Sequence, residues 1–187
     1  PISYLTKMKN QIVLSAITIV AIVFSAFTEK ETTSTMDVNS VESKIKWLGK
    51  KVTGEHYGTI EISKGDLKFN NDKLSGGSFE IDMKSIKNTD LENEEYNQKL
   101  VGHLKSDDFF GVSKYPTATF VIKEVQEKST NKYHVKGHLT IKETTKPIEF
   151  PVEISMIESK AVASASITID RSEFDVRYGS GSFFDGL

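Results

Sequence analysis

The stretch Tyr133–Met156, Y-H-V-K-G-H-L-T-I-K-E-T-T-K-P-I-E-F-P-V-E-I-S-M, decides the fold. In its first half, apolar or small residues take one parity and polar residues take the other. This period-two alternation is typical of a strand with one buried and one solvated side. After a short polar break at 143–145, the alternation resumes from Ile148 to Met156. Two alternating runs around a polar break predict a β-hairpin.

Two prolines interrupt the second strand of this hairpin. Pro147 and Pro151 both take its outward parity. Because proline has no N–H to donate to a sheet, we expect an edge, a bulge or weakened pairing at this point.

The hairpin also resembles a known motif, G-H-L-T-I-K-x-x-T-K-P-I-x-F-P-V, of the YceI-like family of bacterial periplasmic lipid-binding proteins. Five further pieces of the family pattern follow the same order: W-L-G-K-K-V-T-G-E-H-Y-G-T-I at Trp47–Ile60, L-S-G-G-S-F-E-I-D at Leu74–Asp82, G-H-L-K-S-D-D-F-F at Gly102–Phe110, Y-P-T-A-T-F at Tyr115–Phe120 and I-D-R-S-E-F at Ile169–Phe174. The resemblance extends over residues 41–187. It implies a lipocalin-like antiparallel β-barrel that holds one long isoprenoid or acyl chain.

The composition limits the classes of protein to consider. The chain has 187 residues, enough for one domain with a short appendage. Its net charge is −2 without a basic block, which argues against a nucleic-acid-binding protein. The absence of cysteine excludes disulfides, thiolate metal sites, thiol nucleophiles and lipid attachment to a cysteine.

We expect three regions along the chain. In residues 1–27, Lys7 and Lys9 precede an apolar run from Ile12 to Phe27, which is short for a spanning helix of about 20 residues and suits a signal peptide. Residues 28–40 are polar and aperiodic and predict a linker. Residues 41–187 form the barrel domain. We therefore expect export to the periplasm, with a retained membrane anchor or secretion as open alternatives.

The barrel region alternates in short runs separated by turn signals, which predicts an all-β antiparallel fold. We expect turns at 64–66 and 70–72 and a last strand over 161–169. A short helical insertion is expected after Asp90 as its cap, with Leu100, Val101 and Leu104 as its buried stripe. The chain ends shortly after an aromatic pair, so we expect the C-terminal strand that closes the barrel in the resembling family to be missing.

No enzyme motif is present: the sequence has no G-x-S-x-G, H-E-x-x-H, P-loop or G-x-G-x-x-G. We expect no enzyme activity, no cofactor and no metal. His134 and His138 share the polar face of one strand but lie roughly 13 Å apart, too far for one metal ion. We interpret both as solvated surface residues.

Three residues are candidates for contact with a ligand's polar head: His56, His103 and Arg171. His56 and His103 lie in loop or helix segments that could meet at the barrel mouth, either as structural hydrogen-bonding groups or as head contacts. The pair Asp170–Arg171 predicts a structural ion pair or turn lock, with a head-group site as the alternative. Asp107–Asp108 predicts a cap and turn ahead of the aromatic pair 109–110, with a metal site as the alternative.

The apolar inward positions carry the main functional hypothesis. We expect the following to line a lipid site: Trp47, Phe79, Ile81, Phe120, Ile122, Leu139, Ile141, Phe150, Ile154 and Ile167. A barrel of about eight strands is just wide enough either to be filled by side chains or to hold one small ligand. Small inward residues favour space for a ligand: Gly77, Ala118, Gly137, Ala161, Ala163 and Ala165.

Taken with the inward apolar positions, the resemblance to the YceI-like family implies a barrel that sequesters or carries a long-chain isoprenoid or fatty-acyl lipid, with the membrane only as the source of that lipid. One alternative is a structural or interaction barrel with a filled core. A second is an enzyme with an unrecognised site near His56 and His103. The sequence leaves the oligomeric state open, a dimer included.

Overall fold

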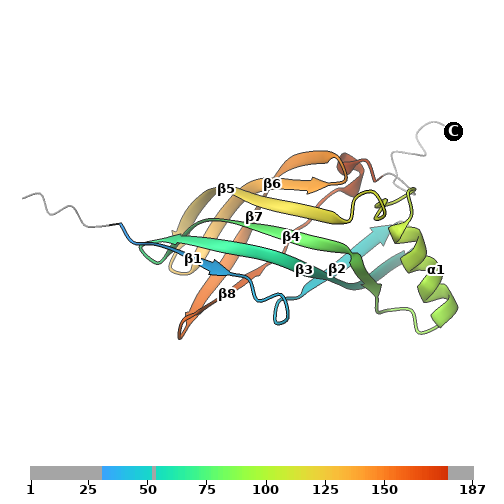
Figure 1. The fold of residues 1–187 in the computed structure, drawn as a ribbon, viewed down its shortest axis with the longest axis horizontal. Helices are drawn as coiled ribbons and strands as arrows, with labels where there is room; N and C mark the ends of the chain where they lie inside the picture. Colours follow the sequence, from blue (N-terminus) through green and yellow to red (C-terminus); the bar gives the residue numbers. More distant parts are fainter. Residues whose placement is uncertain (1–30, 52–53, 177–187) are drawn as a thin grey trace, which may run out of the picture. The chain divides into compact units, whose positions relative to one another are not determined.

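The structure, a computed structural model, describes residues 31–51 and 54–176 (Figure 1). These residues form a nearly closed antiparallel β-barrel with one α-helix. The elements are β1 (Thr33–Asp37), β2 (Ile45–Lys51), β3 (Gly54–Asn70), β4 (Lys73–Asn88), α1 (Glu94–Lys105), β5 (Thr117–Ser129), β6 (Lys132–Ile141), β7 (Thr144–Ile157), β8 (Lys160–Ala165) and a 3₁₀ turn η1 (Arg171–Phe174). The predicted fold class is thus confirmed.

The long strand β3 organises one side of the sheet. The strand order is β1-β3-β4-β5-β6-β7-β8, and β2 also pairs with β3. Residues 54–60 of β3 pair with β2, and residues 66–70 pair with β1. The barrel edges among the described strands are therefore β8 on one side and β1 with β2 on the other.

The hairpin predicted from the alternating stretch is confirmed. β6 and β7 pair without a register shift from Lys132 opposite Glu153 to Ile141 opposite Thr144. Pairing of β7 with β8 begins only at Val152, so the half of β7 that holds Pro147 and Pro151 pairs with β6 alone among the described strands. This is the edge that the two prolines predict.

The core lies on the inward face of the sheet, as the alternation predicts. Val135 on β6 is completely buried, and Phe69, Met83, Ile86 and Ile154 are nearly so. The opposite face is charged: Lys136 Nζ lies 3.9 Å from Glu124 Oε1 and 3.8 Å from Glu149 Oε2. Burial of the apolar face is the main term that stabilises this arrangement.

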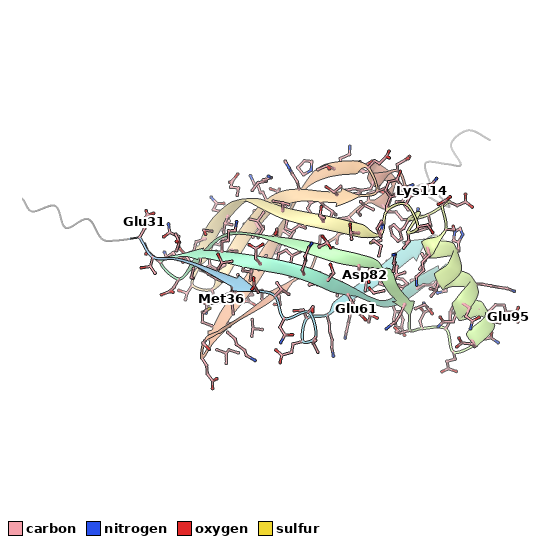
Figure 2. The ribbon with its side chains drawn as sticks, viewed as in Figure 1. Glu31, Met36, Glu61, Asp82, Glu95 and Lys114 are labelled. Carbon is pink, nitrogen blue, oxygen red and sulfur yellow. The ribbon has the colours of Figure 1, made fainter. Side chains whose placement is uncertain are left out.

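Helix α1 covers one end of the strands, and Glu95 on its surface points away from the sheet (Figure 2). The expected buried residue Leu104 is buried, and Leu100 and Val101 are half-buried. The expected cap is wrong, however: Asn93 caps the helix, and its side chain accepts a hydrogen bond from the Tyr96 N–H at 3.1 Å. Asp90 instead takes part in the contacts described below.

Two expected boundaries are also wrong. The expected linker 28–40 contains β1, which pairs with β3 and places Met36 against the core. The expected turn at 64–66 is continuous strand, because Gly65 lies opposite Phe79 within β3. A Cβ at Gly65 would come within 3.0 Å of the Phe79 ring, so glycine here makes room for that ring.

The expected last strand, 161–169, ends early. β8 stops at Ala165, and Ile167 lies beyond it with 48% of its surface exposed. The expectations for the leader at 1–27 and for the closing strand concern residues outside those that the structure describes. Within the described residues, no helix has the length and apolar character needed to cross a bilayer.

Candidate functional site

The candidate site is the inward face of the barrel, where five strands place the expected lining residues. Phe120, Leu139, Ile141, Phe150 and Ile154 are buried in the core. They lie on β5, β6 and β7, which pair in consecutive order. The sequence-predicted parity of these residues is correct.

Four other expected lining residues face the core but remain half-buried: Trp47, Phe79, Ile81 and Ile122. Phe79 and Ile81 lie on β4, which is paired on both sides, by β3 and by β5. Apolar side chains on the inward face of a strand in that position are normally shielded from water. Their residual exposure means that part of the inward face is accessible to solvent.

The remaining expected lining residue, Ile167, is not part of this surface. It was placed inward by extending the parity of β8, but β8 ends two residues before it and its side chain is largely exposed. Of the small residues expected to leave space, Ala163 and Ala165 on β8 are exposed, whereas Ala118 and Gly137 are buried.

Glycine at position 137 shapes the middle of the inward face. An added Cβ at Gly137 would collide with the ring of Phe120 and lie 2.6 Å from the Val121 carbonyl oxygen. The Phe120 ring therefore lies across β6 and reaches Phe150 on β7, with ring centroids 5.3 Å apart. The sequence pattern indicated free space on the inward face at Gly137, but it did not indicate that the Phe120 ring occupies that space.

Trp47 is the lining residue that β2 contributes to the inward face. It lies opposite Gly58, and its indole N–H is 3.2 Å from the Thr59 carbonyl oxygen and 3.1 Å from the Lys87 carbonyl oxygen. These contacts satisfy the polar atom of the indole and leave its ring against the core. The only tryptophan in the chain is thus a fixed part of the candidate site.

The sequence-based list missed several residues of the same surface. Ile60 on β3, Met83 and Ile86 on β4 and Tyr133 and Val135 on β6 are buried with the expected residues. Tyr133 and Val135 share the inward parity of Leu139, so the alternation could have included them. Ile60 belongs to the alternating run at 59–63, so the same reasoning could have included it.

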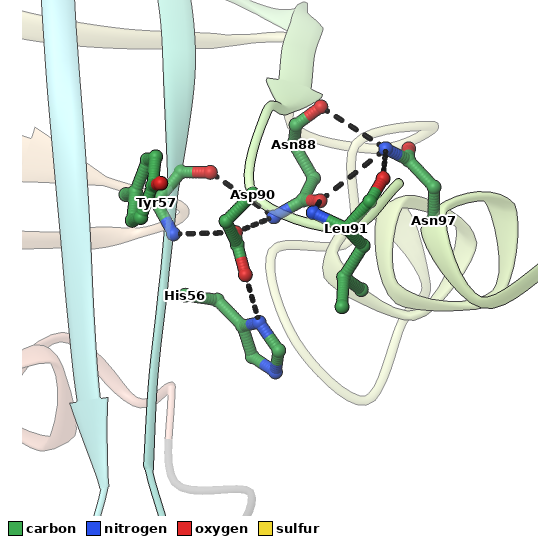
Figure 3. A network of polar contacts seen from close by, with 6 residues as sticks. All are labelled: His56, Tyr57, Asn88, Asp90, Leu91 and Asn97. Carbon is green, nitrogen blue, oxygen red and sulfur yellow. Dashed lines mark hydrogen bonds and ion pairs between the residues drawn. The ribbon is translucent and has the colours of Figure 1, made fainter. Parts of the chain in front are cut away.

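His56, a candidate head-group residue, lies at the start of β3 and contacts an aspartate from another element. Its Nδ1 is 2.8 Å from Oδ2 of Asp90, in the segment between β4 and α1 (Figure 3). Oδ1 of Asp90 accepts hydrogen bonds from the Tyr57 N–H at 2.8 Å and from the Asn88 side-chain amide. No local sequence pattern signals this pairing, since the two residues are 34 positions apart.

Asn88 links the His56–Asp90 pair to helix α1 through hydrogen bonds. Asn88 Oδ1 accepts from the Leu91 N–H at 3.0 Å, and the Asn97 amide donates to the Asn88 and Leu91 carbonyl oxygens (Figure 3). Burial alone would raise the pKa of Asp90, but the hydrogen bonds from His56, Tyr57 and Asn88 outweigh it and hold the pKa below its ordinary value. Asp90 is therefore an ionised acceptor at neutral pH.

The other two candidate head-group residues meet at a different aromatic side chain. The ring of His103 lies edge-on to Phe109 at 5.6 Å, and the Arg171 guanidinium lies 4.9 Å from the Phe109 ring centroid. Such cation–π contacts are attractive. Burial lowers the pKa of Arg171, and the Asp170 charge partly offsets this. His103 and Arg171 are thus brought together, whereas His56 has a separate partner.

The turn lock expected at Asp170–Arg171 is present. Asp170 Oδ1 caps η1 by accepting hydrogen bonds from the Ser172 N–H at 2.8 Å and its hydroxyl at 2.7 Å, and these two bonds lower the pKa of Asp170. Arg171 donates to the Val176 carbonyl oxygen at 2.6 Å.

The two aspartates before the aromatic pair, Asp107 and Asp108, are exposed, and a carboxylate oxygen of Asp107 lies 3.7 Å from Nζ of Lys114. The described residues contain no group of three or more His, Asp or Glu side chains placed to hold a metal ion.

The outward surface carries a cleft of about 410 Å³ over β3, β4 and β5. Lys64, Asp66, Ser78 and Glu80 line it together with the apolar residues Phe79 and Val121, and the hydroxyl of Ser78 donates to Asp66. An apolar chain laid in this cleft would take the charged groups of Lys64, Asp66 and Glu80 out of water without giving them a partner, which is costly. The inward face is therefore the better site for such a ligand.

Comparison with known proteins identifies relatives over most of the chain. The family model of the YceI-like domain matches residues 23–186. A UPF0312 protein of Vibrio cholerae is 28% identical over 116 residues, which are 61% of this chain and 56% of that protein. A UPF0312 protein of Photorhabdus laumondii is 33% identical over 98 residues, 52% of this chain and 48% of that protein. The matched stretches thus span about half the length of these curated relatives.

Solved structures support the same assignment. Burkholderia cenocepacia BcnA superposes with a TM-score of 0.64 at 28% identity, covering 79% of this chain and 89% of BcnA. The YCEI protein of Campylobacter jejuni superposes with a TM-score of 0.50 at 19% identity, covering 96% and 91%. The second likeness concerns the fold alone.

Proposed function

This chain belongs to the YceI-like domain family, and on that premise we propose that its barrel binds one long-chain isoprenoid or fatty-acyl lipid on its inward face. Sequestration or transport of that lipid in the periplasm is the role we propose. The observation that carries the proposal is the solvent-accessible part of the inward face, where Trp47, Phe79, Ile81 and Ile122 are apolar yet only half-buried. An apolar chain laid against these four residues would complete their burial.

The burial of such a chain supplies enough free energy for useful binding. About 16 methylene groups at about 0.8 kcal/mol each give a gross gain of roughly 13 kcal/mol. Association costs of about 4–15 kcal/mol offset much of this gain. At the lower end of these costs about 9 kcal/mol remains, which corresponds to a dissociation constant just below about 1 μM. The selectivity we expect is for chain length and for the head group rather than for fine detail along the chain.

The N-terminal sequence pattern supports the periplasmic part of the proposal. The basic residues Lys7 and Lys9 followed by the apolar run at 12–27 suit a leader that directs the chain across the inner membrane. A carrier is needed in an aqueous compartment because a free long-chain lipid exposes its apolar surface to water there. Cell fractionation with an antibody against the barrel tests this location.

Trp47 provides a direct test of lipid binding, because it is the only tryptophan and forms part of the candidate site. Stearic acid brominated at its ninth and tenth carbons should quench Trp47 fluorescence in a saturable manner, and unbrominated stearic acid should compete with it. Quenching requires the bromines to lie close to the indole. Fluorescence that stays unchanged up to millimolar brominated lipid would contradict binding within the barrel.

A further inference from the structure

The pair formed by His56 and Asp90 has unequal exposure to solvent. The Asp90 side chain is only 13% exposed, whereas the His56 side chain is 31% exposed. Figure 3 shows the second ring nitrogen of His56, Nε2, pointing away from Asp90. Within the described residues, no group hydrogen-bonds to Nε2. The imidazole is thus held at one nitrogen and open at the other.

The hydrogen-bond partners determine where the imidazole carries its proton. Asp90 is ionised and can only accept, so Nδ1 of His56 must donate to it. In the neutral imidazole the other nitrogen then has a lone pair and no proton. In this neutral form, Nε2 is a hydrogen-bond acceptor.

His56 also occupies the correct face of the barrel. It lies on β3 with the same parity as Gly58 and Ile60, both of which are buried. Gly49 lies directly opposite His56 on β2, and a Cβ there would make only ordinary contacts, at 3.8 Å or more. Trp47 is the diagonal neighbour on the same face. The imidazole therefore stands at the end of the inward face, beside a position with no side chain.

We propose that His56 Nε2 accepts a hydrogen bond from the polar end of the bound lipid, and that the site consequently prefers a head group with an O–H or N–H donor. This inference rests on the proposed function. An alcohol meets the requirement, and an ether or an ester does not. Asp90 is the positioning residue, because it acts on the ligand only by fixing the proton on Nδ1.

The geometry of Asp90 makes one substitution especially informative. Oδ1 is bound by two donors, Tyr57 N–H and the Asn88 amide, and Oδ2 faces His56. In Asp90→Asn the carbonyl oxygen would keep the Oδ1 position, and the amide NH₂ would face His56 and donate to Nδ1. The proton of the imidazole would then move to Nε2, which becomes a donor.

The test compares two probes with the same chain, 1-octadecanol and octadecyl methyl ether, at pH 8 with the full chain. Their affinities are measured by displacement of the brominated stearate from Trp47. The wild type should bind the alcohol about threefold to tenfold more tightly than the ether, the effect of one net hydrogen bond. His56→Phe should reduce that ratio to about one through weaker alcohol binding. His138→Phe, at an exposed histidine on the outward face of β6, is the matched control and should keep the ratio.

Asp90→Asn provides the second, nearly isosteric test. The ether should gain affinity, because its oxygen can now accept from Nε2–H, and the ¹⁵N shifts of the imidazole should report the exchanged proton position. A merely structural role of Asp90 would lower the affinity for both probes equally.

Three outcomes separate the inference from the function beneath it. An unchanged alcohol-to-ether ratio in His56→Phe would overturn the role of His56 while leaving lipid binding intact. Equal affinities of the two probes in the wild type would do the same. Failure of both probes to bind the wild type would instead overturn the proposed function.

Discussion

The rings of Phe120 on β5 and Phe150 on β7 lie 5.3 Å apart, centroid to centroid, although the whole strand β6 separates β5 from β7. The contact is formed because Gly137 on β6 has no side chain and the Phe120 ring lies over it. An aromatic pair of this kind contributes about 0.5–1.5 kcal/mol beyond its buried area.

Gly137→Ala should therefore destabilise the barrel. Its Cβ would displace the Phe120 ring and press on the Val121 carbonyl oxygen, which predicts a loss of about 1–3 kcal/mol in the free energy of unfolding. Urea denaturation measures this value. Gly102→Ala is the control: Gly102 lies in α1 with no atom within 4 Å of its added Cβ, so this change should stabilise by about 0.5–1 kcal/mol. Equal stability of Gly137→Ala and wild type would contradict the packing described.

Leu139→Trp should reduce lipid binding while the barrel still folds. Leu139 is buried on the inward face between Phe120 on β5 and Lys146 on β7, and a larger side chain there takes space from a bound chain. We expect less lipid per protein and a stability loss of about 1–3 kcal/mol from overpacking. Val121→Trp, on the outward face, should keep the lipid content. Full lipid content in Leu139→Trp would show that this position does not border the ligand.

Asp90 should make stability depend on pH in the acid range. Because the folded-state pKa of Asp90 is lowered, its contribution is fully present above about pH 5 and is lost as the pH falls below about 4, through that lowered pKa. The stability difference between wild type and Asp90→Asn should therefore shrink as the pH falls. Thermal melts of both proteins from pH 7 to pH 2.5 measure it, and a difference that stays constant over this range argues against an ionised Asp90.

Asn93→Ala should loosen α1 by removing its cap. The lost acceptor for the Tyr96 N–H predicts about 1 kcal/mol lower stability. Amide hydrogen exchange should show faster exchange in the first turn of the helix, with the strands unaffected. Unchanged exchange at Tyr96 would mean that another group caps the helix.

These examples show what the sequence could predict and what it could not. The hairpin β6–β7 and the parity of its inward residues followed from regular alternation, because one face of each strand is buried along its length. β1 was missed because T-S-T-M-D offers a single apolar residue and is held in the sheet by pairing with β3. Gly65 looked like a turn residue, but it accommodates the Phe79 ring, which is distant in sequence.

For the candidate site, too, local features could be predicted from the sequence and contacts between distant residues could not. Nine of the ten expected lining residues face the core, because the side of a strand on which a residue lies follows from local alternation. The prediction for Ile167 is wrong because β8 ends at Ala165, earlier than its composition indicated, and leaves Ile167 exposed. The partner of His56 had no local signal at all. Asp90 was expected to cap a helix, and only the tertiary fold brings it to within 2.8 Å of the imidazole.

The most direct measurement of the central claim is the lipid content of the protein itself. The full chain should be produced in a bacterial host, purified without detergent and extracted with organic solvent, and the extract should be quantified by mass spectrometry against an internal standard. The account predicts about one long-chain isoprenoid or fatty-acyl lipid per protein, and less in Leu139→Trp. A folded barrel that carries no lipid, and takes up none when incubated with lipid vesicles, would contradict it.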